Sequence, residues 1–423
     1  MPGLRTRKRI VRGLFLALGV VPLLVTFSWA SWRSWHDTAS RLADRWSRQL
    51  GLDVELVQVE HTSPGIMRLE GLHIADPESG RPMVLCSSVT LMRHGSSMTI
   101  ECQQLAIRAA HLPELWNLLS QRVLRQPDVW GASFELKAPR AKLVGGTSDV
   151  EWQDLELRVE NSDAGREANL TMTWDDQHDP STVRIVRRTA GLAGRGPAYR
   201  RVHWDTGPTP ISCSLMPWPL DWLQRLGRES HFQGVVWIDE DKQGLHGELT
   251  GHITRVDLTD SLSDRWDVEM AGSVDLAVRK LTFSDGRVGE MEGVIHGGPV
   301  TISPALLSRF AEEFNAPLDF ADTPLDQVDL AQIRFGVRLD QGGIELVGTP
   351  DGVSDQGVLL SDENMRLGIP PSQPVPTTAL IKTIVPSSTM TLPINASSEA
   401  LMRVLPLGRS DQAAQSPRPT RHQ

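Results

Sequence analysis

The stretch ANLTMTW, residues 168–174, alternates apolar and polar side chains more regularly than any other part of the chain. Successive side chains of an extended strand point to opposite faces of a sheet. Leu170, Met172 and Trp174 therefore share one face, and the polar residues between them share the other. One apolar and one wet face are typical of an antiparallel sheet.

The same alternation recurs on both sides of this stretch and indicates many consecutive strands. Before it, Val57 and Val59 alternate with polar neighbours, and turn signals follow at Pro64-Gly65 and at 76–80. We predict further strands at Ser133–Val144, Val150–Glu160, Thr182–Arg188, Tyr199–Asp205, Ile211–Leu215, Phe232–Asp239, His246–Leu258, Val268–Val278, Val288–Ile295, Ile333–Leu339, Ile344–Val347 and Val358–Leu360. The fold class is mainly β with a few short helices, arranged as an elongated antiparallel β-meander or curved sheet.

Short segments with helical periodicity interrupt the strands. Trp35–Leu50 carries an apolar stripe and stops at Gly51, so we expect it to cover one end of the sheet. Ser303 caps a helix that runs through Phe314. The other predicted helices are Leu112–Gln126, Leu220–Leu226, Ala379–Val385 and Glu399–Leu405.

The N-terminal stretch predicts where the protein resides. Five basic residues precede Gly13, and an apolar run continues to Ala30. This pattern favours a single transmembrane helix with its basic end in the cytoplasm. The alternative is a cleaved secretory signal, since Ser28-Trp29-Ala30 resembles a cleavage site. We expect an inner-membrane, single-pass protein with most of its chain in the periplasm.

Composition narrows the choice of partners. The chain of 423 residues has 43 Lys and Arg against 52 Asp and Glu, a net charge of −9. Without the five basic residues before Gly13, the exported part has a net charge of about −14, which argues against nucleic acid as a partner. Cys86, Cys102 and Cys213 lack metal-site spacing. Cys86 and Cys102 either form a disulfide between neighbouring strands or, the favoured interpretation, lie as small apolar residues on the buried face.

The boundaries of these features divide the chain into five segments. They are a basic tail with the anchor (1–34), a first helix-plus-sheet section (35–215), a second such section (216–370), a Pro-rich segment with short apolar helices (371–407) and a disordered tail (408–423).

No pattern in the sequence predicts a reaction centre. The acids 239–241 fit a solvated turn better than a calcium or catalytic site, and His246 and His252 lack a third metal ligand. The glycine-rich stretch 191–196 has no helix after it to bind phosphate. We therefore predict no catalytic residue, cofactor or metal, and a protein that is not an enzyme; a hydrolase built on Asp239 and Asp241 is the minor alternative.

Two motifs resemble the opening of AsmA/TamB-like envelope proteins. The first is L-x7-L-G-x2-V, formed by Leu42, Leu50, Gly51 and Val54. The second is V-x4-P-G-x3-L-x-G-L-x-I-x-D-P-x2-G, which begins at Val59 and ends at Gly80. The segments 249–258 and 283–288 are similar to the strand-and-turn pattern of that family, and the whole chain resembles a group of uncharacterised planctomycete membrane-anchored proteins. The chain is shorter than the large family members.

The resemblance implies a β-rich groove in which lipid tails lie while head groups stay in water. The candidate groove residues are Leu69, Val89, Ile100, Leu170, Met172, Trp174, Val235, Trp237 and Leu249. The same residues would equally suit the core of an ordinary sandwich. The expected function is a membrane-anchored scaffold for lipid contact, lipid transfer or envelope biogenesis, with phospholipid and other envelope proteins as partners. The alternative is an anchored protein–protein interaction or assembly module without lipid.

Overall fold

The computed structural model describes most of the chain between residues 16 and 385. The described ranges are 16–35, 37–124, 133–145, 150–162, 165–174, 179–188, 198–216, 220–263, 268–316, 327–348, 360–361, 366–368, 371 and 373–385. The predicted helix Glu399–Leu405 and the tail 408–423 lie outside these ranges.

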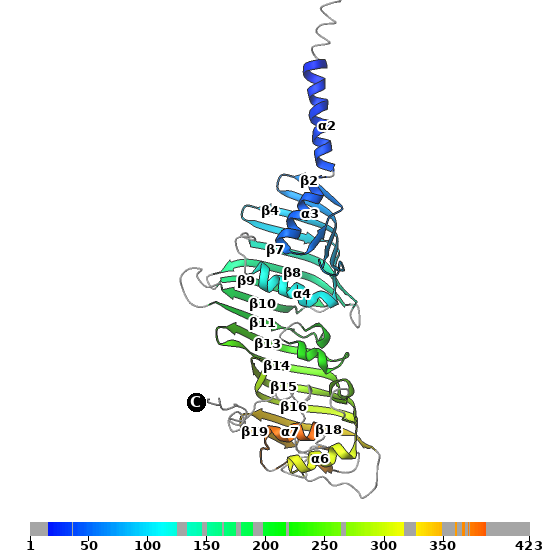
Figure 1. Ribbon diagram of the computed structural model, residues 1–423, viewed down its shortest axis with the longest axis vertical. Helices are drawn as coiled ribbons and strands as arrows, with labels where there is room; N and C mark the ends of the chain where they lie inside the picture. The colour runs from blue at the N-terminus through cyan, green and yellow to red at the C-terminus, as the bar shows by residue number, and fades with distance from the viewer. Residues whose placement is uncertain are drawn as a thin grey trace, which may run out of the picture.

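The described strands form a single sheet whose spatial order follows the chain (Figure 1). They are β1 (Asp53–Glu55), β2 (Gln58–Ser63), β3 (Ile66–Ala75), β4 (Pro82–His94), β5 (Ser97–Cys102), β6 (Leu105–Arg108), β7 (Ser133–Val144), β8 (Val150–Ser162), β9 (Gly165–Trp174), β10 (Ser181–Arg188), β11 (Tyr199–Asp205), β12 (Ile211–Ser212), β13 (His231–Asp241), β14 (Gly244–Asp257), β15 (Met270–Ser284), β16 (Arg287–Ile302), β17 (Val328–Leu330), β18 (Gln332–Asp340), β19 (Gly343–Gly348), β20 (Leu360–Ser361) and β21 (Arg366–Gly368). At the usual strand spacing the sheet is about 65 Å long in the hydrogen-bonding direction.

The prediction of a mainly β protein is confirmed, but the expectation of a purely antiparallel meander is wrong at one place. β7 runs parallel to β5 and β6, with Met98 opposite Phe134 and Ile107 opposite Leu143. A parallel neighbour requires a crossover connection, and the helical segment that begins at Leu112 supplies it. All other pairs of neighbouring strands among the described residues are antiparallel. Strand β11 pairs with β13, so the sheet continues across residue 216.

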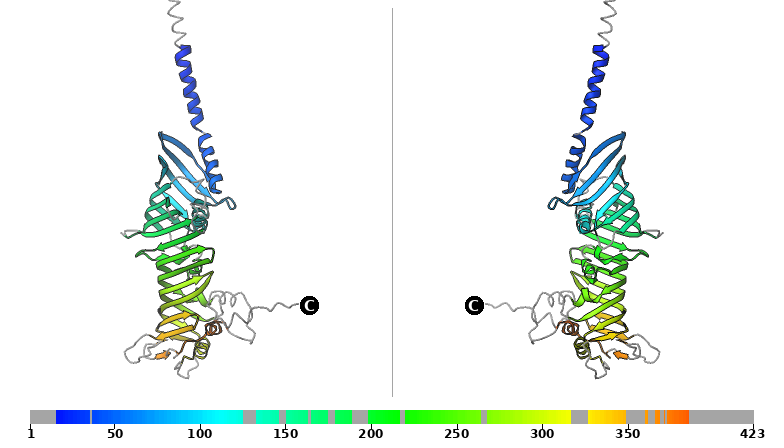
Figure 2. Two further views of the ribbon diagram at one scale, coloured as in Figure 1. Left: turned by 90° about the vertical axis from the view of Figure 1, so that its left-hand side faces the viewer. Right: turned by 90° about the vertical axis from the view of Figure 1, so that its right-hand side faces the viewer.

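Helices lie along one face of the sheet (Figures 1 and 2). They are α3 (Asp37–Leu50), η2 (Ala109–His111), α4 (Leu112–Asn117), η3 (Leu118–Val123), η5 (Cys213–Leu215), η6 (Asp221–Leu226), η7 (Thr259–Ser263), α6 (Pro304–Phe314) and α7 (Thr377–Ile384). The predicted helix at 304–314 is confirmed at both ends, and those at 35–50, 220–226 and 379–385 are confirmed with shifted ends. The helix predicted at 112–126 is confirmed from Leu112 to Val123 as α4 and η3, and residues 125–126 lie outside the described ranges. Residues 213–215 form η5, so the expected strand Ile211–Leu215 is shorter than predicted.

The two faces of the sheet differ in polarity. Leu155, Val183 and Trp204 lie on the face that the helices cover, and all three are buried. The outer face carries cross-strand ion pairs such as Arg184–Glu167 at 2.8 Å and Arg201–Asp239 at 2.6 Å. Exposed pairs such as Arg201–Asp239 contribute little to stability, about 0–1 kcal/mol each, so burial of the apolar face holds the sheet together.

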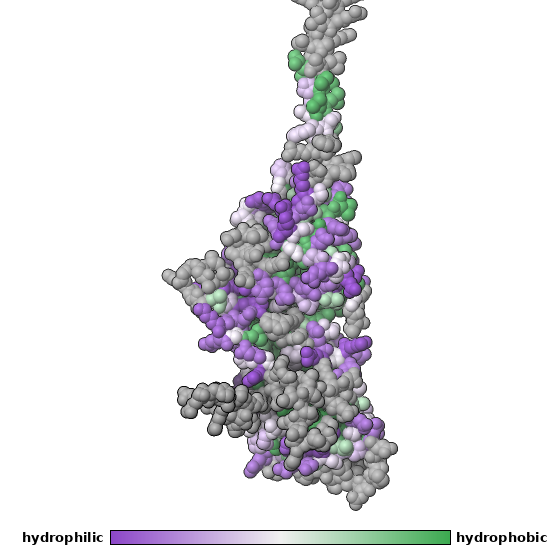
Figure 3. Space-filling view, viewed as in Figure 1, coloured by the Kyte–Doolittle hydropathy of each residue, from purple (hydrophilic) through white to green (hydrophobic). Residues whose placement is uncertain are grey.

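The N-terminal segment η1 (Leu16–Val20) and α2 (Val21–Trp35) projects away from the sheet (Figures 1 and 2). Apolar side chains on it face outward: Leu18 is 71% exposed, Leu23 is 70% and Phe27 is 71%. Hydrophobic surface is visible on this helix in Figure 3. Among the residues described, no single helix has both the length and the apolar character needed to cross a membrane.

Candidate ligand-binding groove

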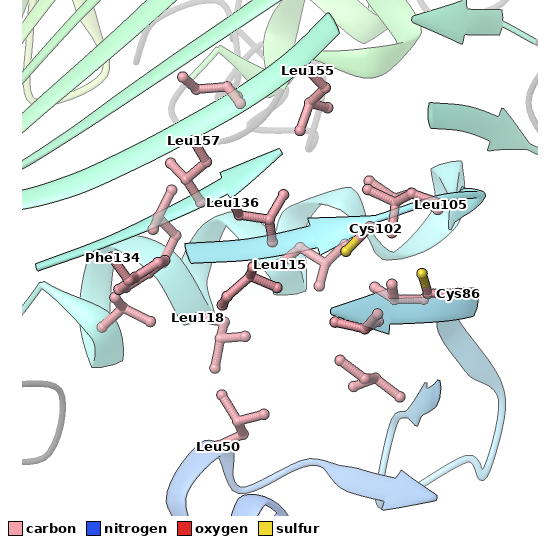
Figure 4. Close-up of a pocket in the computed structure, with 18 of the residues that line it drawn as sticks. Leu50, Cys86, Cys102, Leu105, Leu115, Leu118, Phe134, Leu136, Leu155 and Leu157 are labelled. Atoms are coloured by element: carbon pink, nitrogen blue, oxygen red, sulfur yellow. The ribbon is translucent and has the colours of Figure 1, made fainter. Parts of the chain in front are cut away.

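The N-terminal half of the covered face contains an apolar groove. Its volume is about 670 Å³, and it extends from α3 to β11 and η5. Figure 4 shows side chains of α3, α4 and several strands facing this common space, among them Leu50, Leu115 and Leu157. The groove is therefore bounded by the sheet on one side and by short helices on the other.

Two helical segments form the cover of the groove because each has one apolar stripe. In α3, Leu42, Trp46 and Leu50 recur at helical spacing and line the groove. Gly51 ends this helix with a φ of +63°, and its N–H donates a hydrogen bond to the Ser47 carbonyl at 2.7 Å. In α4 and η3 the lining residues are Leu112, Leu115, Trp116, Leu118, Leu119 and Val123.

Five of the nine candidate residues from the sequence line the groove. They are Val89, Ile100, Leu170, Met172 and Trp174. Leu69 and Leu249 are each 0% exposed and pack in the core outside the groove. The structure thus brings together the candidates on β4, β5 and β9.

The prediction for Val235 and Trp237 is wrong, because both lie on the outer face of β13. Their neighbours Val236 and Ile238 point inward and are buried. Trp237 is 47% exposed, and its ring contacts that of His203 in a tilted arrangement, with centroids 3.9 Å apart and an interplanar angle of 40°.

Polar lining residues are confined to one end of the groove. Arg45 and Gln49 come from α3, whereas Arg93, Ser96 and Ser97 come from the β4–β5 hairpin. From Leu105 onward along the chain, every lining residue is apolar or aromatic. The groove is thus suited to a long hydrocarbon chain rather than to a polar substrate.

Three tryptophans form the wall of the groove at its far end. The rings of Trp152 and Trp174 meet edge to face at 5.6 Å. The indole N–H of Trp174 donates to Ser181 Oγ at 2.9 Å, and that hydroxyl donates to the Thr206 carbonyl. The Nε1 atoms of Trp152 and Trp204 are buried and have no acceptor among the described residues.

Cys86 and Cys102 lie on the groove wall with their sulfur atoms facing each other (Figure 4). Both are free thiols, as the favoured interpretation expected. A hydrogen bond from the Cys102 thiol lowers the pKa of Cys86 to about 7, and the same interaction together with burial raises the pKa of Cys102. In the sheet register Cys102 lies opposite Val89 of β4, and Cys86 lies opposite Leu105 of β6.

Among the described residues of the C-terminal half, large apolar side chains of the covered face pack in the core. Phe232, Ile253 and Leu223 are each 0% exposed, and Phe314 of α6 is 2% exposed. The groove therefore ends near Leu215, where Cys213 and Met216 are fully buried.

The described residues contain no group of acids, histidines or cysteines that could hold a metal ion. Asp239 is engaged in its ion pair with Arg201, on the outer face. The glycine-rich stretch 191–196 lies outside the described residues. Comparison with known proteins found no matching family, no matching curated protein and no matching solved structure.

Proposed function

We propose that this protein is a non-enzymatic, membrane-anchored envelope protein of AsmA-like type that holds lipid tails in its groove. The observation that carries the proposal is the groove itself, whose lining is apolar over most of its length. Its volume of about 670 Å³ falls within the roughly 300–1,000 Å³ of ordinary ligand sites.

The energetics favour an apolar occupant. Apolar surface left in contact with water costs about 25 cal/mol per Å², and an acyl chain gains about 0.8 kcal/mol for each buried CH₂ group. An acyl chain lying along Leu136, Leu157 and Leu170 would remove its own surface and that of the groove lining from water at once. The three residues lie side by side across the sheet, because Leu136 is opposite Leu157 and Leu157 is opposite Leu170.

The N-terminal segment supports a position at the membrane. Its outward-facing apolar side chains, such as Leu18 and Leu23, follow a basic flank in the sequence. We propose that the segment anchors the chain in the inner membrane and that the sheet extends into the periplasm. A groove beginning at α3 would then open close to the membrane surface.

The glycines of the AsmA-like motif support the resemblance at the level of local conformation. Gly65, Gly71 and Gly80 have φ values of +84°, +63° and +64°. These left-handed conformations favour glycine: Gly65 and Gly80 lie in the turns before and after β3, and Gly71 lies within β3. They support the family proposal only for the start of the sheet.

An anchored assembly module without lipid is the second candidate. The buried apolar side chains of the C-terminal half favour it, because a well-packed half of this kind would serve an assembly module as a rigid spacer. The two candidates differ in what the groove contains in the cell.

Lipid analysis of the purified full chain tests the proposal. We expect extraction and mass spectrometry to recover phospholipid from the wild-type protein and several-fold less from Leu170→Asp, because a carboxylate in the groove is costly to bury. Thr173→Asp, on the opposite face of β9, is the matched control and should retain the lipid. A folded wild-type protein without lipid would favour the assembly module.

A further inference from the structure

Three arginines stand directly opposite one another across β9, β10 and β11. Arg187 of β10 is in register with Arg166 of β9 on one side and with Arg200 of β11 on the other. Opposed residues of neighbouring antiparallel strands have Cα atoms about 4.5–5.5 Å apart, so the row spans about 10 Å. We call these three residues the arginine row.

The arginine row lies on the same face as the groove. Side chains alternate along a strand, so residues four apart share a face. Arg166, Arg187 and Arg200 are each four positions from a groove-lining residue, namely Leu170, Val183 and Trp204 respectively. At about 3.3 Å per residue, the row lies about 13 Å from these residues.

Two arginines of the row are almost fully withdrawn from water. Arg166 is 5% exposed and Arg200 is 4% exposed. Loss of water lowers the pKa of both guanidinium groups. Like charges directly opposite each other in a sheet are also destabilising. In the described part of the row one acid is in register with it, Glu240, whose Oε2 lies 2.7 Å from Nη2 of Arg200.

The row is held in place and borders the cover of the groove. Nη1 of Arg187 donates to the Ser120 carbonyl at 2.8 Å and to Oε1 of Gln121 at 3.0 Å, both on η3. The same helical segment lines the groove with Leu118 and Leu119. All three arginines have interactions within the protein.

We propose that the arginine row binds the anionic, phosphate-type head group of a lipid whose tail lies in the groove. A lipid with an anionic head group matches this face of the sheet. Along each of β9, β10 and β11, the side chains change from apolar groove lining to an arginine within four residues. Arginine suits this role because its planar guanidinium donates paired hydrogen bonds to phosphate oxygens. This inference rests on the proposed function and adds the site that binds the head group.

The test compares two probes that share one tail. Hexadecyl phosphate and hexadecanol are titrated by calorimetry into the full chain in an uncharged detergent, with inorganic phosphate as the head group alone. We expect the wild-type protein to bind hexadecyl phosphate at least about tenfold more tightly than hexadecanol. Inorganic phosphate should bind far more weakly than either, because it has no tail to bury.

Variants on the two faces of one strand decide where the phosphate binds. Arg187→Gln should reduce the preference for hexadecyl phosphate to about twofold or less. Arg184→Gln removes a cation of the same strand from the outer face, where Arg184 pairs with Glu167, and should keep the full preference. Arg166→Gln is measured in parallel, because Arg187 also holds η3 and its loss could unfold that segment.

The outcomes separate the two proposals. If the wild-type protein binds both tailed probes equally, or if folded Arg187→Gln and Arg166→Gln proteins retain the preference, the head-group site is wrong while the groove proposal stands. If neither tailed probe binds, the proposed function fails as well. Tight binding of inorganic phosphate without a tail would also overturn the inference, since it would indicate a free-anion site.

Discussion

At the scale of single residues, the thiol pair in the groove wall has unequal acidity. The Cys102 thiol donates its hydrogen bond to the Cys86 sulfur and so stabilises the Cys86 thiolate. The pKa of Cys86 therefore falls to about 7 from its ordinary value of 9.0. Above pH 7 this thiolate is the reactive form of the pair.

The first prediction concerns the pH dependence of alkylation. The rate at which a small reagent modifies Cys86 should rise through a midpoint near pH 7, measured by peptide mass spectrometry. In Cys102→Ala the hydrogen bond is gone, so the midpoint should move up toward 9. Cys213 is an internal control, because burial raises its pKa to about 11. An unchanged midpoint in Cys102→Ala would contradict the assigned hydrogen bond.

Single residues also show where sequence reasoning failed. Alternation identified Leu170, Met172 and Trp174 correctly, because their neighbours are polar. In β13 the run Val235-Val236-Trp237-Ile238 is apolar on both faces, so a period of two cannot tell the inner from the outer side. Trp237 was therefore assigned to the wrong face. The arginine row was missed because charged residues at isolated strand positions give no signal until the register is known.

At the scale of elements, helix α6 covers the filled half of the sheet and has a defined start. Ser303 has extended backbone angles, and its side chain accepts a hydrogen bond from the Leu306 N–H. Pro304 follows at the first helical position, where a backbone N–H would have no acceptor within the helix, so its absence in proline costs nothing. Leu306, Leu307 and Phe314 then face the core.

The second prediction tests this cap. Ser303→Ala should reduce the free energy of unfolding by about 1 kcal/mol, because the Leu306 N–H loses its side-chain acceptor and keeps only the Ser303 carbonyl. Ser308→Ala lies on the exposed face of the same helix and should leave stability unchanged or slightly raised, since alanine favours helices. Thermal or denaturant unfolding measures both variants. Equal effects would show that the cap contributes nothing.

Most elements were predictable because turns and apolar periods are local properties. Strand β7 and strand β11 were located to the residue, and the helix after Ser303 was recognised from its cap and stripe. The parallel placement of β7 was not predictable, since both an antiparallel and a crossover connection are compatible with a helix at 112–126. The groove was implied by resemblance, but its limits depend on which helices fill the face.

At the scale of the whole molecule, one sheet carries two differently occupied halves. The N-terminal half has a groove of about 670 Å³, whereas the C-terminal half is packed with side chains such as Phe232 and Leu249. A ligand bound only to the folded state stabilises the part that it contacts. The two halves should therefore respond differently to removal of lipid.

The third prediction uses amide hydrogen exchange to compare them. After lipid is removed from the full chain, amides of β8, β9 and η3 should exchange faster, by about tenfold or more, because these elements lose a packing partner. Amides of β14 and β15 should be unchanged, because their core is filled by protein. Equal acceleration in both halves would indicate global destabilisation instead of loss of a groove ligand.

The most direct test of a lipid-holding groove is site-specific photocrosslinking in living cells. A photoreactive amino acid is placed at Leu170, inside the groove, and separately at Trp237, on the outer face of the same sheet. Mass spectrometry then reads which position carries a lipid adduct. We expect a phospholipid adduct at position 170 and none at position 237. No adduct at position 170, or equal adducts at both positions, would contradict it.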